Sequence, residues 1–183
     1  MTPILETARL VFRPYETADR ESLVALFTDP EIMKFVGDGV QAEDRAREGF
    51  GRIFTHVYGP RAFDLWALVS KEDGAFVGHA ELKPRRDALA RAGDFEIIYV
   101  LRRESWGRGL ATEAGRGILE YGFGAPRLPR IHATVDAANV PSVRVLTKLG
   151  MLYEAEFEDE FGTTLVYVVN AERFGAFAAA AQE

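Results

Sequence analysis

An apolar stretch, a glycine-rich turn and a helix follow one another directly near the middle of the chain. Residues 94–101, DFEIIYVL, are its most hydrophobic strand candidate and predict a central strand of a sheet. Gly107 and Gly109 flank Arg108 after that strand, and glycine accepts positive φ and lets the backbone approach a ligand. Residues 110–121 predict a helix, whose first turn has free N–H groups and the positive end of the helix dipole. Together these elements predict an anion site best suited to phosphate.

Two common phosphate-binding motifs do not fit this turn. A Walker loop needs a lysine after a longer glycine loop, and the sequence has none. A dinucleotide fingerprint needs a third glycine where Thr112 stands, and it belongs near the first strand of a βαβ unit. An ordinary strand-to-helix connection with a glycine kink is the structural alternative to an anion site.

The remaining sequence predicts hairpins first and alternation of helices and strands later. The expected strands are residues 9–15, 62–69, 75–82, 94–101, 130–136, 151–160 and 163–170, and the expected helices are 19–28, 29–36, 42–58, 110–121, 140–150 and 171–183. No linker, repeat or low-complexity segment divides the chain. We therefore expect one α+β domain over residues 1–183, with a mixed, mostly antiparallel sheet of about seven strands and helices on both faces.

Composition narrows the classes of function. The chain has no cysteine, which excludes disulfides, thiolate metal sites and a cysteine nucleophile. Its three histidines stand on different predicted elements without ligand spacing, so we expect no metal site. The net charge of −6 disfavours nucleic acid as a partner, and it suits either a cationic substrate or solubility alone. No signal peptide and no apolar run of about 18 residues is present, so we expect a cytoplasmic protein without a membrane partner.

Four segments, in the same order, resemble the GNAT acetyltransferases, specifically their RimJ/RimL-type branch. Residues 106–114, WGRGLATEA, resemble the acyl-CoA pyrophosphate loop of that branch. Residues 5–19 resemble its opening strand and helix entry, residues 29–37 its second helix, and residues 137–151 its second signature. The resemblance extends over residues 4–177 and implies a single GNAT-like domain.

The resemblance also implies the donor and the residues that hold it. The donor would be acetyl-CoA, used as a co-substrate, and no metal would take part. Backbone amides of the turn would hold the pyrophosphate, and backbone N–H groups at the end of the central strand would bind pantetheine and polarise the thioester carbonyl. The cofactor-binding residues implied in this way are Val100, Leu101, Trp106, Gly107, Arg108, Gly109, Leu110, Ala111, Thr112, Asn139 and Ser142.

Asn139 and Ser142 lie three residues apart at the start of a predicted helix and so share one face. An asparagine can donate and accept hydrogen bonds, which suits pantetheine amides, and capping of the helix is the alternative role. Many acetyltransferases of the superfamily place a tyrosine acid where this chain has Leu146. Ser142 is therefore the best remaining candidate for the catalytic acid, with a hydrogen bond to pantetheine as its alternative role.

Glu96 is the candidate catalytic base. It shares its face of the central strand with Ile98 and Val100. A carboxylate on so apolar a strand is costly unless it is hydrogen-bonded or functional, and burial would raise its pKa toward the working range of a base. The alternative is a structural glutamate paired with a basic side chain such as Arg9 or Arg13.

These expectations describe an acetyl-CoA-dependent N-acetyltransferase that transfers the acetyl group directly to a primary amine. The acceptor stays open between a protein N-terminus, an amino acid and a small-molecule amine, because its identity depends chiefly on the loops at residues 34–41 and 84–93. The alternative is a catalytically reduced acyl-CoA-binding module with a role in regulation or assembly. The oligomeric state is also open, with a homodimer as one option.

Overall fold

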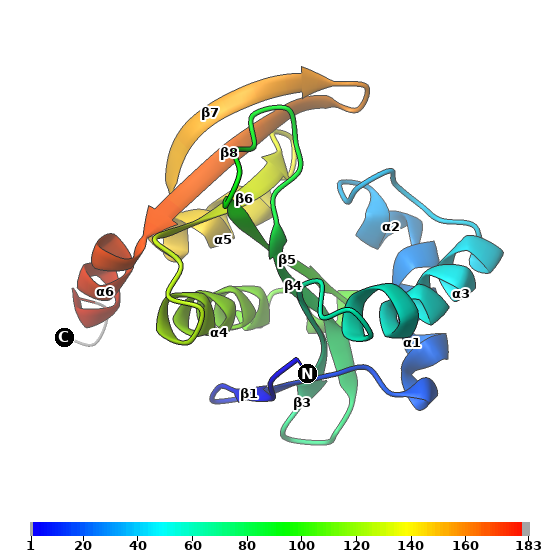
Figure 1. The fold of residues 1–183 in the computed structure, drawn as a ribbon. Coiled ribbons are helices and arrows are strands. Elements are labelled where there is room, and N and C mark those ends of the chain that lie inside the picture. Colours follow the sequence, from blue (N-terminus) through cyan, green and yellow to red (C-terminus); the bar gives the residue numbers. More distant parts are fainter. Residues whose placement is uncertain (1, 181–183) are drawn as a thin grey trace.

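Eight strands form one mixed sheet with helices on both of its faces (Figure 1). The computed structural model describes residues 2–180. The elements are β1 (Leu5–Glu6), β2 (Leu10–Arg13), η1 (Thr17–Asp19), α1 (Arg20–Thr28), α2 (Pro30–Met33), α3 (Glu43–Arg52), η2 (Ile53–Tyr58), β3 (Asp64–Ser70), β4 (Phe76–Pro84), β5 (Phe95–Leu101), η3 (Arg103–Ser105), α4 (Leu110–Gly124), β6 (Arg130–Asp136), α5 (Val140–Lys148), β7 (Leu152–Asp159), β8 (Gly162–Asn170) and α6 (Ala171–Ala180).

The expected α+β class is confirmed, with differences in detail. The helix expected over residues 29–36 is the four-residue α2, which ends at Met33 and is followed by turns. The sheet has eight strands because the two-residue β1 pairs with β2 beside the strands expected from the sequence. The helix expected over residues 42–58 is α3 followed by the wider π-helical segment η2. The last helix is described to Ala180, and residues 181–183 of the expected helix lie outside the described residues.

Two apolar clusters hold the layers together. On one face of the sheet, α1 to α3 and η2 pack on β3 and β4, and the buried side chains there include Tyr15, Leu26, Met33, Phe50 and Ile53. On the other face, α4 and α5 pack on the central strands, and the buried side chains there include Phe12, Trp66, Ile118, Ile131 and Leu146. In Figure 1 these two groups of helices lie on opposite sides of the sheet. Within residues 2–180, no helix combines the length and the apolar character needed to cross a bilayer.

The sheet opens between β5 and β6. The strand order is β1-β2-β3-β4-β5-β6-β8-β7, and only the β5–β6 pair is parallel. That pair shares a single register position, Glu96 opposite His132, whereas β4 and β5 pair over seven positions and β6 and β8 over another seven. Beyond Glu96 the two strands diverge, and the half of the sheet that carries the long β7–β8 hairpin turns away from the other half (Figure 1). The carboxyl end of β5 therefore has a free backbone edge on its β6 side.

Gly78 allows β4 to approach the end of β5. A Cβ at this position would collide with the carbonyl oxygen of Val100 and would lie 3.0 Å from the Cα of Leu101. Because both atoms belong to the backbone, they can yield only if β5 shifts. We expect Gly78→Ala to destabilise the fold by about 3 kcal/mol, which corresponds to a fall of roughly 6–12 °C in Tm for a domain of this size.

Gly51→Ala is the matched control for this prediction. Gly51 lies in α3, and a Cβ there would meet no atom within 4 Å. Alanine has the higher helix propensity, so this variant should be as stable as the parent or more stable. Thermal unfolding of the two variants tests the packing argument, and a Tm for Gly78→Ala equal to that of the parent would contradict it.

Candidate active site

A cavity of about 400 Å³ occupies the opening between β5 and β6. Its walls come from five parts of the chain: the loop after α2, the end of β5, β6, the start of α5 and the tip of the β7–β8 hairpin. Its lining residues include four that belong to the candidate site, which are Val100, Thr134, Asn139 and Ser142. Elements that are far apart in sequence thus converge where the sheet splits.

The free edge of β5 directs backbone donors into this opening. The amide of Arg85 donates to Asp94 O and the amide of Arg102 donates to Val77 O, so the even-numbered residues of β5 bond to β4. Because successive N–H groups of a strand point to opposite sides, the Val100 amide points to β4. The Leu101 amide points to the open side. Of the two residues expected to contact pantetheine, Leu101 therefore has the free amide.

The glycine turn presents free amides next to that edge. Gly107 has φ of 71° and Gly109, the N-cap of α4, has φ of 77°. Within the described chain, the amides of residues 107–109 donate to no other protein group, and the helical ladder of α4 begins with the Glu113 amide donating to Gly109 O. The amides of Leu110, Ala111 and Thr112 form the first turn of α4, whose N–H groups have no partner within a helix. These amides and the positive end of the helix dipole can hold a phosphate group.

Trp106 holds the turn against the end of β5. Its indole Nε1 donates a hydrogen bond of 2.9 Å to Leu101 O, while 49% of the residue stays exposed. The carbonyl that it satisfies lies on the open side of β5, where the neighbouring strand has diverged. Trp106 thus caps the free edge of the strand instead of filling the core.

Arg9 and Glu113 brace the turn from behind. Glu113, in the first turn of α4, accepts hydrogen bonds from the Arg9 amide (2.7 Å), from Arg9 Nε (2.6 Å) and from Thr7 Oγ1 (2.6 Å). Arg9 Nη1 also donates to Arg108 O at 2.9 Å. A carboxylate would oppose an anion at this helix end, but Arg9 neutralises its charge. This brace could not be predicted from local sequence patterns, because its members lie about a hundred residues apart.

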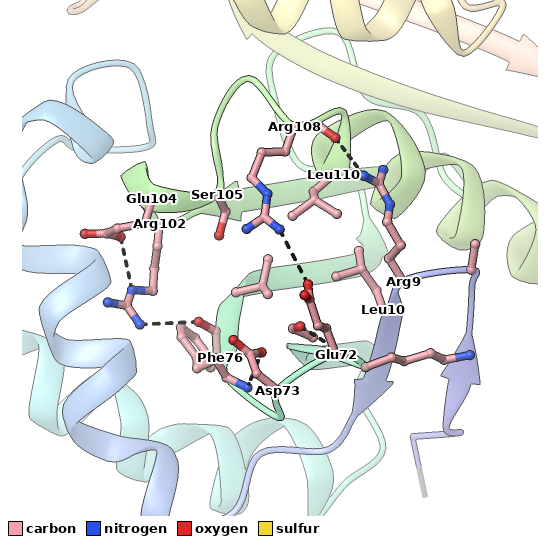
Figure 2. A pocket seen from close by; sticks show the side chains of 15 residues that line it. Arg9, Leu10, Glu72, Asp73, Phe76, Arg102, Glu104, Ser105, Arg108 and Leu110 are labelled. Carbon is pink, nitrogen blue, oxygen red and sulfur yellow. Dashed lines mark hydrogen bonds and ion pairs between the residues drawn. The ribbon is translucent and has the colours of Figure 1, made fainter.

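A second cavity of about 400 Å³ is lined by Arg9 of this brace and by Ser105, Arg108 and Leu110 around the glycine turn (Figure 2). The Arg108 guanidinium points into it toward Glu72 of the β3–β4 turn, 3.9 Å away, while Arg102 pairs with Glu104. Neither Glu96, Asn139 nor Ser142 lines this cavity. Its charged side chains are largely paired with one another, so it supports the turn and does not gather the residues expected to react.

Asn139 and Ser142 lie together at the start of α5, as their spacing predicts. Asn139 is the N-cap of α5, and its Oδ1 accepts a hydrogen bond of 3.2 Å from the Ser142 amide. The capping role of Asn139 is therefore real, and its side-chain NH₂ remains as the group that can reach a ligand. The Ser142 hydroxyl lies 3.0 Å from the hydroxyl of Tyr99 on β5. Tyr99 is a residue of the site that the sequence patterns did not indicate.

Glu96 lies next to the cavity but does not line it. Its Oε2 accepts a hydrogen bond of 3.3 Å from Thr134 Oγ1, and Thr134 lines the cavity. Lys83 Nζ is 3.9 Å from its Oε1. Burial raises the pKa of Glu96 above its ordinary value, and the charge of Lys83 and the Thr134 hydrogen bond oppose this only in part. The carboxylate can thus take up a proton from the cavity through Thr134 or an intervening water.

A basic side chain does lie beside Glu96, but it is neither of the two arginines named as examples. Arg9 pairs with Glu113 at 2.6 Å, and Arg13 pairs with Asp19 at 2.7 Å. Both arginines are at the edge of the sheet formed by β1 and β2, and β3 and β4 separate that edge from β5. The cation beside Glu96 is Lys83, which stands directly opposite it in the β4–β5 register.

Glu81 is a second buried carboxylate on the same face of the sheet. It lies 2.8 Å from His79 Nε2 and 3.2 Å from Lys83 Nζ. Burial opposes its ionisation, but the hydrogen bond with His79 and the charges of His79 and Lys83 outweigh burial and lower its pKa to about 2. Glu81 therefore stays ionised as a structural anion, whereas Glu96 holds a proton more readily. Of the two carboxylates, only Glu96 is suited to act as a base.

No cluster of three metal-binding side chains occurs among residues 2–180. His79 bonds to Tyr15 and Glu81, and His132 lies 3.3 Å from both Phe95 O and a Glu154 oxygen. Both histidines are buried, and their partners are protein groups of the sheet.

Comparisons with known proteins agree with this geometry. The acetyltransferase (GNAT) domain family matches residues 9–152. The uncharacterized N-acetyltransferase YnaD of Bacillus subtilis is 29% identical over 154 residues, which cover 84% of this chain and 85% of that protein. The crystal structure of a GNAT-family acetyltransferase from Bacillus anthracis has a TM-score of 0.79 and 26% identity, covering 93% of this chain and 99% of its own. A spermidine N-acetyltransferase from Vibrio cholerae, solved with CoA and spermine, has the same fold with a TM-score of 0.76 and 17% identity, covering 92% and 99%.

Proposed function

The chain belongs to the GNAT acetyltransferase family and is an acyltransferase of that type, and on this premise we propose that it transfers an acetyl group from acetyl-CoA directly to a primary amine. One observation carries the proposal. The end of β5 and the start of α5 line one opening in the sheet, and the turn with free amides is held beside the free edge of β5 by the Trp106–Leu101 hydrogen bond. A thioester with a long pantetheine arm and a pyrophosphate needs these three kinds of contact in this order.

Each part of the donor has a matching group in the opening. Residues 107–112 offer amides and a helix N-terminus to the pyrophosphate. The Leu101 amide and the Asn139 side-chain NH₂ can bond to the pantetheine and thioester oxygens. The Arg108 side chain, which points to Glu72, contributes less to phosphate binding than its backbone.

Three residues supply the chemistry. Glu96 takes a proton from the acceptor ammonium through Thr134 or a water, which frees the nitrogen lone pair to attack the thioester carbon. The new C–N bond forms, the C–S bond breaks, and the electron pair of the C–S bond leaves with sulfur. The attacking nitrogen then releases its second proton to water, which leaves a neutral amide. The Ser142 hydroxyl donates a hydrogen bond to that sulfur as charge develops on it.

The other end of the cavity fits a cationic aliphatic amine. Its walls include three phenylalanines, two carboxylates and one lysine, and these residues are Phe35, Phe157, Phe161, Asp136, Asp159 and Lys34. The Lys34 ammonium lies over the Phe35 ring, 5.1 Å from its centre, so Phe157, Phe161 and the two carboxylates remain for a ligand. Aromatic faces and carboxylates both attract an ammonium group. The solved spermidine N-acetyltransferase from Vibrio cholerae holds CoA and spermine on the same fold. We therefore rank small aliphatic amines, polyamines included, above amino acids and protein N-termini as acceptors.

The RimJ/RimL-type branch is the finer family assignment that we propose. It rests on the order of four similar segments and on a tryptophan before the glycine turn. In the structure this tryptophan donates a hydrogen bond to the carbonyl of Leu101 at the β5 edge, which is a structural role for a tryptophan at this position.

The function is tested by donor binding and by turnover. Acetyl-CoA at 100 times its Kd should stabilise the fold by about 2.7 kcal/mol, which corresponds to roughly 5–10 °C in Tm. Release of the CoA thiol should then be measured with a panel of polyamines, amino acids and short peptides. We expect the highest kcat/KM with a polyamine. Stabilisation without thiol release would identify a catalytically reduced CoA-binding module, and absence of stabilisation would refute the proposal.

A further inference from the structure

Tyr99 brings a phenol into the opening from the strand opposite Ser142. Tyr99 is on β5 and Ser142 is in the first turn of α5, and their hydroxyl oxygens are 3.0 Å apart. Both residues line the cavity between β5 and β6. Leu146, one turn further along α5, lines the same cavity with an apolar side chain. Tyr99 is therefore the phenol that this chain directs at the start of α5.

The direction of the hydrogen bond follows from the chemistry of the two hydroxyls. Within the described residues, Ser142 is the partner that the structure shows for the Tyr99 hydroxyl. A phenol is a stronger acid than an aliphatic alcohol and is the better donor of the two, so we assign the donor role to Tyr99 and the acceptor role to Ser142 Oγ. Burial also raises the pKa of Tyr99 to about 12, so the phenol keeps its proton at neutral pH and remains a donor.

This bond determines where the Ser142 proton can point. A serine hydroxyl rotates freely and can both donate and accept. With the phenol donating to its oxygen, and its amide bonded to Asn139 Oδ1, the hydroxyl proton of Ser142 is left for a group in the cavity. Under the proposed function that group is the thioester sulfur.

We propose that Tyr99 is a positioning residue for departure of the thiol: it orients the Ser142 hydroxyl so that the serine proton points at the thioester sulfur. The inference rests on the proposed function and deepens it. When the C–S bond breaks, sulfur takes the electron pair, the Ser142 O–H hydrogen bond stabilises the thiolate, and the thiolate later takes a proton from water. Tyr99 keeps its own proton throughout and acts only through Ser142.

The test compares Tyr99→Phe, Ser142→Ala and the double variant. Tyr99→Phe keeps the ring and removes the hydroxyl, so the serine can still donate but is no longer oriented. We expect kcat to fall roughly three- to tenfold in Tyr99→Phe and roughly ten- to a hundredfold in Ser142→Ala, with KM for acetyl-CoA within about twofold of the parent in both. The double variant should match Ser142→Ala, because Tyr99 has no route to the sulfur without the serine.

A measurement without turnover separates positioning from structural support. The ultraviolet absorbance of the thiolate gives the pKa of the CoA thiol bound to each variant. A hydrogen bond to the thiolate lowers that pKa, so it should rise by about 0.5–1 unit in Tyr99→Phe, and the double variant should equal Ser142→Ala. Tyr121→Phe is the matched control. Tyr121 lies on α4, away from the opening, and its hydroxyl donates a hydrogen bond of 2.8 Å to Asp64. This variant should lower Tm without changing the thiol pKa or kcat.

The possible outcomes separate the role of Tyr99 from the proposed function. Additive losses in the double variant, or an unchanged thiol pKa in Tyr99→Phe, would overturn the role of Tyr99 while turnover by the parent upheld the proposed function. A parent protein that neither binds CoA nor releases thiol would overturn both.

Discussion

Gly107→Asp should weaken acetyl-CoA binding by roughly 100-fold or more, because it places a negative charge in the proposed pyrophosphate site. At 5 Å and an effective dielectric constant near 20, one carboxylate opposes each phosphate charge by about 3 kcal/mol. The side chain itself meets no obstacle, since a Cβ on Gly107 has no atom within 4 Å. The fold should therefore persist, while the CoA-dependent rise in Tm disappears.

Gly107→Asn is the matched control for charge. Gly107 has φ of 71°, and Asn and Asp tolerate this left-handed region better than other side chains. Both variants thus carry the same backbone strain and nearly the same volume, and they differ by one charge. Calorimetric Kd values for CoA should be much closer to the parent for Asn than for Asp. Equal Kd values for the two variants would show that the pyrophosphate lies elsewhere.

Gly109 is a less decisive position for this experiment. A Cβ on Gly109 would lie 3.6 Å from Arg9 Nη2. An aspartate there could pair with the guanidinium that already neutralises Glu113, and the pair would hide the charge effect. Because Arg9 lies beside Gly109, Gly107 is the better position at which to test phosphate binding.

Local features of the site could be predicted from the sequence because short-range geometry determines them. A strand, two glycines and a helix in succession require a turn with positive φ and free amides, and the structure has both at Gly107 and Gly109. Asn139 and Ser142 share a face because three residues separate them at a helix start. The capping role of Asn139 followed from residue type alone.

Partners across the sheet could not be predicted, because they depend on strand order and register. As the alternative to a catalytic base, Glu96 was to pair with a basic side chain such as Arg9 or Arg13 near the first strand, but β3 and β4 intervene. The register instead places Lys83 opposite Glu96, and Thr134 reaches it from β6. Tyr99 was missed for the same reason, since nothing local connects it with Ser142, 43 residues later.

Glu96→Gln should lower kcat about 100-fold or more while leaving CoA binding intact, because the amide keeps the shape of the side chain but cannot take a proton. The direction in which the rate changes with pH is a second test of this role. Burial raises the pKa of Glu96, so the rate for the parent should rise with pH through a pKa above that of an ordinary glutamate and then level off. That limb of the profile should be missing in Glu96→Gln.

Stability at neutral pH distinguishes a base from a structural carboxylate. A carboxyl whose pKa is raised by folding favours its protonated form in the native state, so its contribution to stability is present at low pH and is lost as pH rises through the folded pKa. At pH 7 an ionised Glu96 therefore opposes folding, and the neutral glutamine should leave Tm unchanged or raise it. Asp19→Asn is the matched control, because burial of Asp19 is outweighed by its hydrogen bonds with Arg13 and with the Glu16 amide, which lower its pKa. That carboxylate stabilises the fold above its unfolded pKa, so the control should lose Tm at pH 7 and keep its kcat. A Glu96→Gln variant that behaves like Asp19→Asn would make Glu96 a structural partner of Lys83 and would leave deprotonation of the amine to solvent.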